Sequence, residues 1–289
     1  MGEGGPGRLR SGEPSATARG VAMRRAAHQL FDDPKVLDDP LATRIIGEDA
    51  ARGLLDQFDQ HQHPFNRALR AHVVARSRYA EDCLHAAYAR GVRQYLVLGA
   101  GLDTFAWRNP HPDLKVFEID HPSTQAWKLQ RLTEAQAPKP DSLVFAPVDF
   151  QTGTLAQGLA SAGFDPARPA FASWLGVSMY LTEDAAMRTL TDLAGMAAGS
   201  ETVFDFGVPP QTLEPLARMA QEALAARVAA AGEPFLSAFD PATLPERLRA
   251  LGFSEVEILG GPELNRLYFD GRADGLRLAG ASRIARARV

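Results

Sequence analysis

Apolar residues between positions 91 and 289 occur in short runs that alternate with segments of helical periodicity. The run 95–98, YLVL, is too short for a helix and ends at a glycine, which is typical of a strand covered on both faces. The alternation predicts a Rossmann-like, doubly wound α/β fold with a sheet of about seven strands. Strands are expected near residues 94–99, 115–120, 143–148, 170–175, 201–207, 254–259 and 281–288. Helices are expected near residues 102–107, 123–136, 152–162, 183–198, 211–231 and 241–251.

The last strand is expected to run antiparallel, at or beside an edge of the sheet. Parallel neighbours need a long crossover, usually a helix, whereas the segment "GGPELNRLYFDGRADGLRLAG" before the last strand shows no long helical pattern. Residues 15–90 have helical patterns without a convincing strand. We therefore predict a disordered leader over 1–14, an N-terminal helical cap over 15–90 and the sheet domain over 91–289. The cap should end at Gly91, since glycine is favoured just after a helix.

Charge and composition exclude several classes of partner. With 31 basic and 35 acidic residues and a net charge of −4, the chain has no positive surplus to neutralise nucleic-acid phosphates. Cys83 is the single cysteine, so one chain can build neither a disulfide nor a thiolate zinc site. No run approaches the ~18 apolar residues of a membrane span. We expect a cytoplasmic protein that acts without nucleic acid, membrane or metal.

Candidate chemistry begins at the glycine turn after the first strand, in "VLGAGLDTFAWR". Gly99 and Gly101 allow the backbone to turn sharply and to approach a ligand. The dinucleotide fingerprint requires a third glycine where this chain has Thr104. The second strand ends in Asp120, where nucleotide-binding folds hold ribose hydroxyls, and the third ends in Asp149, which either binds an adenine amino group or caps the next helix. Together these features favour an adenosine site.

Four motifs occur in order along the chain: "VLGAGLDTFAWR", "FEIDHPSTQAWK", "PVDF" and "WLGVSMYLTEDA". Together they resemble the class I S-adenosylmethionine-dependent methyltransferases of the leucine carboxyl methyltransferase family, which includes bacterial and polyketide-tailoring O-methyltransferases. The likeness extends from "TARGVAMRRAAHQLFDDP" to "ELNRLYFDGRADGLR", nearly the whole chain after the leader. It implies S-adenosyl-L-methionine as the cofactor and a methyltransferase core over residues 91–289.

The resemblance also implies roles for individual residues. Gly99, Ala100 and Gly101 would lie along the methionine and ribose of the cofactor, and Asp120 would bind the ribose hydroxyls. Arg76 would pair with the cofactor carboxylate, a natural use of a guanidinium. Asp149 and Phe150 would bind the adenine. Arg25 would close over the carboxylate end of the cofactor, and the adjacent Arg24 is the alternative residue for this role.

The acceptor side is less defined. Protein-methylating members of the family carry an acid where this chain has Leu175 before Gly176, so the resemblance favours a small-molecule acceptor, either a natural product or a metabolite. Weak candidates for catalysis or acceptor contact are His28, Tyr180, Tyr268 and Arg272, whereas Trp107 and Trp127 are expected to be packing residues. His61 and His63 have a spacing that could serve a metal beside Asp59, but a polar loop before Pro64 is the favoured interpretation, and a loop that lines the acceptor pocket is a third.

The sequence thus predicts an O-methyltransferase that acts on a carboxylate or hydroxyl of a small molecule. Displacement at a sulfonium methyl group depends on alignment and exclusion of water. A carboxylate needs no base, whereas a hydroxyl does. Two alternatives remain: an NAD-dependent oxidoreductase, opposed by Thr104 and by the lack of a Tyr-x-x-x-Lys pair, and a non-catalytic adenosine-binding regulator. The oligomeric state cannot be read from the pattern.

Overall fold

The computed structural model describes residues 15–148, 154–279, 281 and 283–289. The predicted leader 1–14 and the predicted adenine contacts Asp149 and Phe150 lie outside the described residues. Within the described part of the chain, strands and helices alternate from residue 94 onward, as the hydrophobic pattern predicts. The predicted α/β class is confirmed.

The centre of the molecule is a seven-stranded sheet with the order β3-β2-β1-β4-β5-β7-β6, counted over the described residues. The first five strands are parallel, and β7 runs antiparallel to both β5 and β6. The strand expected to return antiparallel does so, beside the edge strand. The strands are β1 (Gln94–Leu98), β2 (Lys115–Asp120), β3 (Leu143–Pro147), β4 (Phe171–Trp174), β5 (Glu201–Phe206), β6 (Glu255–Gly260) and β7 (Arg283–Arg288).

Helices cover both faces of the sheet because side chains alternate along each strand. On β1, Tyr95 and Val97 pack into one buried cluster, and Leu96 and Leu98 into the other. All five residues of β1 are buried, which explains why the central strand reads as a continuous apolar run. The helices after β1 are α6 (Phe105–Arg108), α7 (Pro122–Glu134), α8 (Leu155–Ser161), α9 (Glu183–Ala194), α10 (Pro215–Ala230), α11 (Leu244–Leu251) and α12 (Gly261–Tyr268).

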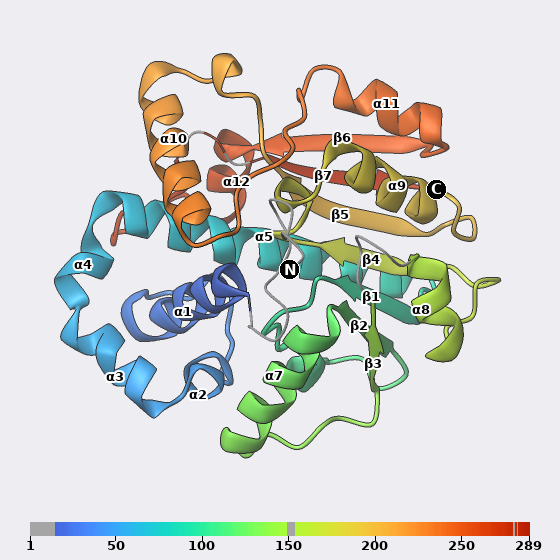
Figure 1. The fold of residues 1–289 in the computed structure, drawn as a ribbon, viewed down its shortest axis with the longest axis horizontal. Coiled ribbons are helices and arrows are strands. Elements are labelled where there is room, and N and C mark those ends of the chain that lie inside the picture. The colour runs from blue at the N-terminus through green and yellow to red at the C-terminus, as the bar shows by residue number, and fades with distance from the viewer. Residues whose placement is uncertain (1–14, 149–153, 280, 282) are drawn as a thin grey trace, which may run out of the picture.

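The N-terminal helices lie mainly beyond one end of the sheet (Figure 1). The long helix α5 instead packs on the sheet itself, and Gly91 follows it with a positive φ of 103°, as predicted. The division of the chain near residue 90 stays a prediction. These helices are α1 (Ala16–Phe31), α2 (Ala42–Ile46), α3 (Glu48–Asp56), α4 (Phe58–Gln62) and α5 (Pro64–Ala89).

Two details differ from the predicted elements. The helix expected over 211–231 is divided into a 3-10 turn, Pro210–Thr212, and α10, because Pro215 occupies the first turn of a new helix. The segment before β7 contains the short helix α12, which Pro262 initiates and Glu263 caps by accepting from the Gly260 amide. Among the described residues, none of the helices combines the length and the hydropathy needed to cross a lipid bilayer.

Candidate active site

A cavity of about 300 Å³ opens where β1, β2 and β4 end. Ligands of open α/β sheets bind at this carboxyl edge, where neighbouring connections diverge to opposite faces. The first turns of α1, from Ser15 to Ala22, line the opposite side, together with Glu233, Pro234 and Phe235. The cavity therefore lies between the sheet and the N-terminal helices.

The glycine turn after β1 forms one wall of this cavity. Gly99 and Gly101 both have positive φ, 65° and 50°, a conformation that residues with a Cβ rarely adopt. A Cβ on Gly99 would lie 2.3 Å from Cγ2 of Val177, and one on Gly101 would lie 3.3 Å from the Cβ of Ala18. The two glycines thus allow the turn to pass close to the loop after β4 and to α1.

Asp120 faces this turn from the end of β2. Its Oδ2 accepts a 2.6 Å hydrogen bond from the Gly101 amide, and its Oδ1 accepts one of the same length from the His121 amide. Burial raises the pKa of Asp120, and the two amides act in the opposite direction. The carboxylate lines the cavity and, since each oxygen can accept more than one bond, it retains acceptor capacity for a ligand.

Arg76 reaches the same cavity from α5 and is held from below by Asp205 of β5. Nη1 of Arg76 donates a 2.6 Å hydrogen bond to Oδ2 of Asp205, whose side chain is fully buried. Burial alone would raise the pKa of Asp205, but Arg76, His72 and the Gly176 amide hold it well below its usual range. The Arg76 guanidinium is therefore fixed in the wall of the cavity, against Gly176 of the loop after β4.

The N-terminal helix α1 is fastened to the cavity by Glu233. This carboxylate accepts hydrogen bonds of 3.0 and 2.9 Å from the backbone amides of Ala16 and Thr17, which a helix leaves unsatisfied in its first turn. Close by, the rings of Tyr180 and Phe235 lie 5.3 Å apart and both line the cavity. Burial raises the pKa of Tyr180 to about 12, so its phenol is a hydrogen-bond donor at neutral pH.

The cavity also has a polar inner end beneath α5. The hydroxyls of Tyr95 and Ser173, from β1 and β4, lie 2.8 Å apart and are buried. Glu81 of α5 lines this end and binds the guanidinium of Arg108 through both carboxylate oxygens, at 2.7 and 3.0 Å. None of these residues was singled out from the sequence.

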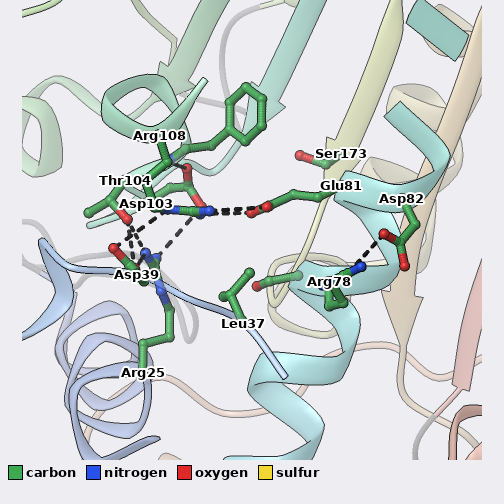
Figure 2. A network of polar contacts seen from close by, with 12 residues as sticks. Arg25, Leu37, Asp39, Arg78, Glu81, Asp82, Asp103, Thr104, Arg108 and Ser173 are labelled. Carbon is green, nitrogen blue, oxygen red and sulfur yellow. Dashed lines mark hydrogen bonds and ion pairs between the residues drawn. The ribbon is translucent and has the colours of Figure 1, made fainter. Parts of the chain in front are cut away.

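Arg25 lines the cavity, but its guanidinium belongs to a network of buried polar groups (Figure 2). It pairs with Asp39, donates to the Thr104 hydroxyl and to the Leu102 carbonyl, and lies 3.6 Å from Asp103. The network joins α1 to the segment that follows the glycine turn. The neighbouring Arg24 turns back and donates to the Gly20 carbonyl at 2.8 Å.

Three of the four weak candidates are not brought to the cavity. His28 of α1 is fully buried, where Nδ1 binds Asp32 at 2.8 Å and Nε2 accepts from the Val36 amide at 3.0 Å. Tyr268 donates a 2.8 Å hydrogen bond to Asp82, and Arg272 pairs with Asp274. Of these candidates only Tyr180 lines the cavity.

The histidine pair has local structural contacts. His63 caps α5 by accepting from the Phe65 amide, and the His61 ring lies 5.9 Å from the ring of Phe31. In the part of the chain that the structure describes, no group of three or more His, Cys, Asp or Glu side chains is arranged to hold a metal ion. Trp107 and Trp127 pack at the edge of a buried apolar cluster.

Asp205 is the residue most clearly missed by the sequence reasoning. A signal was present: it is a lone acid inside the apolar run "TVFDF". A carboxylate inside a central strand is buried, and buried charges require a partner. The sequence does not say which partner, because Arg76 lies 129 residues away.

The strand order, the antiparallel β7 and an acid at the end of β2 beside a glycine turn define the fold of the class I methyltransferases. A structure of a Thermobifida fusca YX protein named as a methyltransferase is similar with a TM-score of 0.59 at 19% identity, covering 96% of this chain and 95% of that chain. A DUF574 family protein from Streptomyces avermitilis MA-4680 gives a TM-score of 0.55 at 18% identity, covering 86% and 96%. These likenesses show the fold alone.

Sequence comparisons give the family. The family model described as "Leucine carboxyl methyltransferase" matches residues 18–194. YktD of Bacillus subtilis (strain 168), whose name assigns it to the S-adenosyl-L-methionine-dependent methyltransferases, is 31% identical over 291 residues, which cover 93% of this chain and 95% of YktD. The chain therefore belongs to the leucine carboxyl methyltransferase family, and S-adenosyl-L-methionine is its cofactor. The predictions of family and cofactor are confirmed.

Proposed function

We propose that this methyltransferase transfers the methyl group of S-adenosyl-L-methionine to an oxygen atom, carboxylate or hydroxyl, of a small molecule. The observation that carries the proposal is that Arg76 and Asp120, from α5 and β2, line one cavity with the glycine turn of β1. A cationic group and a carboxylate that line one cavity with a turn containing two glycines are complementary to an amino acid joined to a ribose. When bound, S-adenosyl-L-methionine supplies a methyl group on a positively charged sulfur.

The residues present fit this cofactor. Asp120 would accept the ribose hydroxyls, and Gly99, Ala100 and Gly101 would lie along the methionine and ribose, where the absence of a Cβ on the two glycines leaves room. Arg76 would donate to the methionine carboxylate. Asp149 and Phe150 are the proposed adenine contacts, and Arg25 is proposed to close the carboxylate end through the network that it anchors.

The chain itself provides alignment and exclusion of water. Holding an acceptor oxygen in line with the methyl group can supply ~7–11 kcal/mol of the barrier reduction. The first turns of α1, held by Glu233, would cover the reacting groups, and Tyr180 would donate a hydrogen bond to the acceptor. A protonated phenol cannot serve as a base, and His28 has both ring nitrogens bonded within the cap. Neither of these two candidates thus supplies a base, which supports a carboxylate acceptor, although His121 and Glu81 also line the cavity and the acceptor series below separates the two classes.

The form of the acceptor end supports a small molecule. Leu175 lines the cavity where protein-methylating relatives carry an acid, so the role of that acid is not available here. A non-catalytic regulator would show an occluded acceptor side, whereas here the cavity continues past the glycine turn to Tyr180 and Phe235. This arrangement supports a small-molecule acceptor.

The test uses methyl-labelled S-adenosyl-L-methionine and the full-length protein. Matched pairs of small aromatic and aliphatic carboxylic acids and their alcohols or phenols are offered as acceptors, along with a peptide that has a free terminal carboxylate. A methyl ester releases methanol in mild base, whereas a methyl ether does not. Label in a small acceptor supports the proposal, with base-labile label identifying a carboxylate. Label transferred to the peptide alone would contradict it.

A further inference from the structure

Asp205 does not line the cavity, yet its contacts determine where Arg76 lies. Oδ2 accepts from Nη1 of Arg76 at 2.6 Å, and Oδ1 accepts from the backbone amide of Gly176 at 2.5 Å. One carboxylate thus joins α5 to the loop that follows β4, and both of those elements line the cavity.

The Asp205 carboxylate is itself rigidly placed. It is 0% exposed and belongs to β5, which pairs with β4 and β7 on its two sides. The Ser178 hydroxyl donates to the Asp205 carbonyl at 2.7 Å, so the loop after β4 is bound to the strand as well as to the side chain. His72, one turn before Arg76 on α5, places Nε2 3.4 Å from Oδ2.

Arg76 retains donors that the protein does not use. Its Nη2 group lies against Gly176, where a Cβ would come within 2.6 Å of it. Gly176 has a positive φ of 74°, so the loop presents a bare backbone edge to the guanidinium. Among the described residues, neither Nη2 nor the buried Nε of Arg76 has a hydrogen-bond partner. Asp205 therefore engages Nη1, and of the two remaining nitrogens Nη2 is the one available to another anion, because Nε is buried.

We propose that Asp205 is a positioning residue that acts through Arg76 on the methionine carboxylate of the cofactor. This inference rests on the proposed function, because it requires Arg76 to bind that carboxylate. A guanidinium on a flexible stem must be immobilised before it can pair with a ligand, and the contact with Asp205 immobilises it in the free protein. Asp205 should thus affect the amino-acid half of the cofactor and not the adenosine half.

Two ligands separate these halves. S-adenosylhomocysteine carries both the adenosine and the amino acid, whereas 5′-methylthioadenosine carries the adenosine and lacks the amino acid. Both are titrated calorimetrically into the wild type and into Asp205→Asn, which keeps the side-chain volume and removes the charge. We expect about 10- to 100-fold weaker binding of S-adenosylhomocysteine, by analogy with the loss of a residue that orients a metal-binding side chain. Binding of 5′-methylthioadenosine should change by less than about threefold.

The chain offers a matched control on the same strand. Glu201 is also a buried acid of β5, but Arg90, Arg286 and Arg288 bind it at the far end of the strand, away from the cavity. Glu201→Gln should destabilise the fold without changing the ratio of the two affinities. Arg76→Met should reproduce the ligand-selective loss, and adding Asp205→Asn to it should cause no further loss, because the two residues act as one unit.

A second variant keeps the proposal testable if Asp205→Asn does not fold. Asp205→Glu retains the charge but displaces it by one methylene, and its affinity for S-adenosylhomocysteine should lie between the wild type and Asp205→Asn. An equal loss for both ligands, or no loss for S-adenosylhomocysteine, would overturn the role of Asp205 while leaving the proposed function intact. If the wild type binds neither ligand, the proposed function fails and the role of Asp205 fails with it.

Discussion

The hydroxyl group of Thr104 donates a 2.7 Å hydrogen bond to the carboxylate of Asp39. Thr104 follows the glycine turn of β1, and Asp39 precedes α2, so this bond joins the sheet to the N-terminal helices. Arg25 of α1 binds both groups and completes the junction (Figure 2). The residue that departs from the dinucleotide fingerprint therefore helps to join the N-terminal helices to the segment after the glycine turn.

This junction should carry a large share of the stability. Asp39→Ala leaves Arg25 without its main partner in a buried position, and breaking a buried pair in this way costs about 3–5 kcal/mol. The free energy of unfolding, measured in urea at neutral pH, checks the loss. Asp38→Ala is the control, because Asp38 is exposed and should change stability by less than about 0.5 kcal/mol. Equal effects of the two substitutions would show that the network does not stabilise the fold.

The same pair predicts a pH dependence. Burial alone would raise the pKa of Asp39, but Arg25 and Arg108 hold it below its usual value of 3.8. The unfolded chain therefore takes up a proton first as the pH falls, so the stabilisation is complete above about pH 4 and is lost as the pH falls through the folded pKa. The stability gap between wild type and Asp39→Ala should be constant from neutral pH to about pH 5 and narrow below about pH 4. A difference in stability between wild type and Asp39→Ala that increases as the pH falls would contradict the predicted direction.

The fold could be predicted from the sequence because each strand and turn is indicated by a short segment of neighbouring residues. Short apolar runs such as 95–98 mark buried strands, and Gly99, Gly101 and Asp120 mark the ends of the first two. The pairing of Arg76 with Asp205 was not readable, because it depends on which strand lies under α5. Sequence patterns indicate which face of a helix or strand is buried, whereas the contact between Arg76 and Asp205 depends on how α5 packs against the sheet.

The acceptor candidates show the same limit. His28 and Tyr180 are both polar residues that the sequence suggested for the acceptor side. In the structure His28 hydrogen-bonds to Asp32 and Val36, whereas Tyr180 lines the cavity. The position of each side chain depends on a tertiary contact, with Asp32 for His28 and with Phe235 for Tyr180. The roles that the family resemblance implies for cofactor contacts stay predictions for each residue.

Gly99→Ala should damage the cofactor site. The new Cβ would lie 2.3 Å from Val177 in a positive-φ conformation, which costs about 1–2 kcal/mol before any clash is counted. We expect at least about tenfold weaker binding of S-adenosylhomocysteine, equivalent to about 1.4 kcal/mol. Gly53→Ala is the opposite case, since this α3 glycine has open space around it and the change should stabilise by about 0.5–1 kcal/mol. If Gly99→Ala binds S-adenosylhomocysteine as tightly as the wild type does, the ligand does not bind beside Gly99.

Tyr180→Phe tests the acceptor side separately. The pKa of about 12 keeps the phenol protonated, so its removal takes away a hydrogen-bond donor and not a base. Methyl transfer should fall by about tenfold, the value of one neutral hydrogen bond, while the affinity for S-adenosylhomocysteine stays unchanged. Its pH–rate profile should keep the shape of the wild-type profile. Loss of the acid limb in the variant, the rise in rate with pH that reports an essential base, would show that Tyr180 acts as a base after all.

Glu233→Ala should weaken the attachment of the start of α1 to the cavity. The carboxylate satisfies two amides at the start of α1, and removing such a cap costs about 1 kcal/mol. Hydrogen exchange over residues 16–24 should become faster, and S-adenosylhomocysteine should dissociate more rapidly in stopped-flow measurements. Glu222→Ala, on the exposed face of α10, should leave both rates unchanged. If the two variants behave alike, α1 is not held by this contact.

The most direct test of the central claim is a calorimetric titration of the wild-type protein with S-adenosylhomocysteine and with NAD, repeated on Asp120→Ala. The cavity lined by the glycine turn, Asp120 and Arg76 predicts saturable binding of one molecule of S-adenosylhomocysteine per chain. Asp120→Ala should abolish this binding, and NAD should not bind. Binding of NAD without S-adenosylhomocysteine, or full binding by Asp120→Ala, would contradict the assignment of the site.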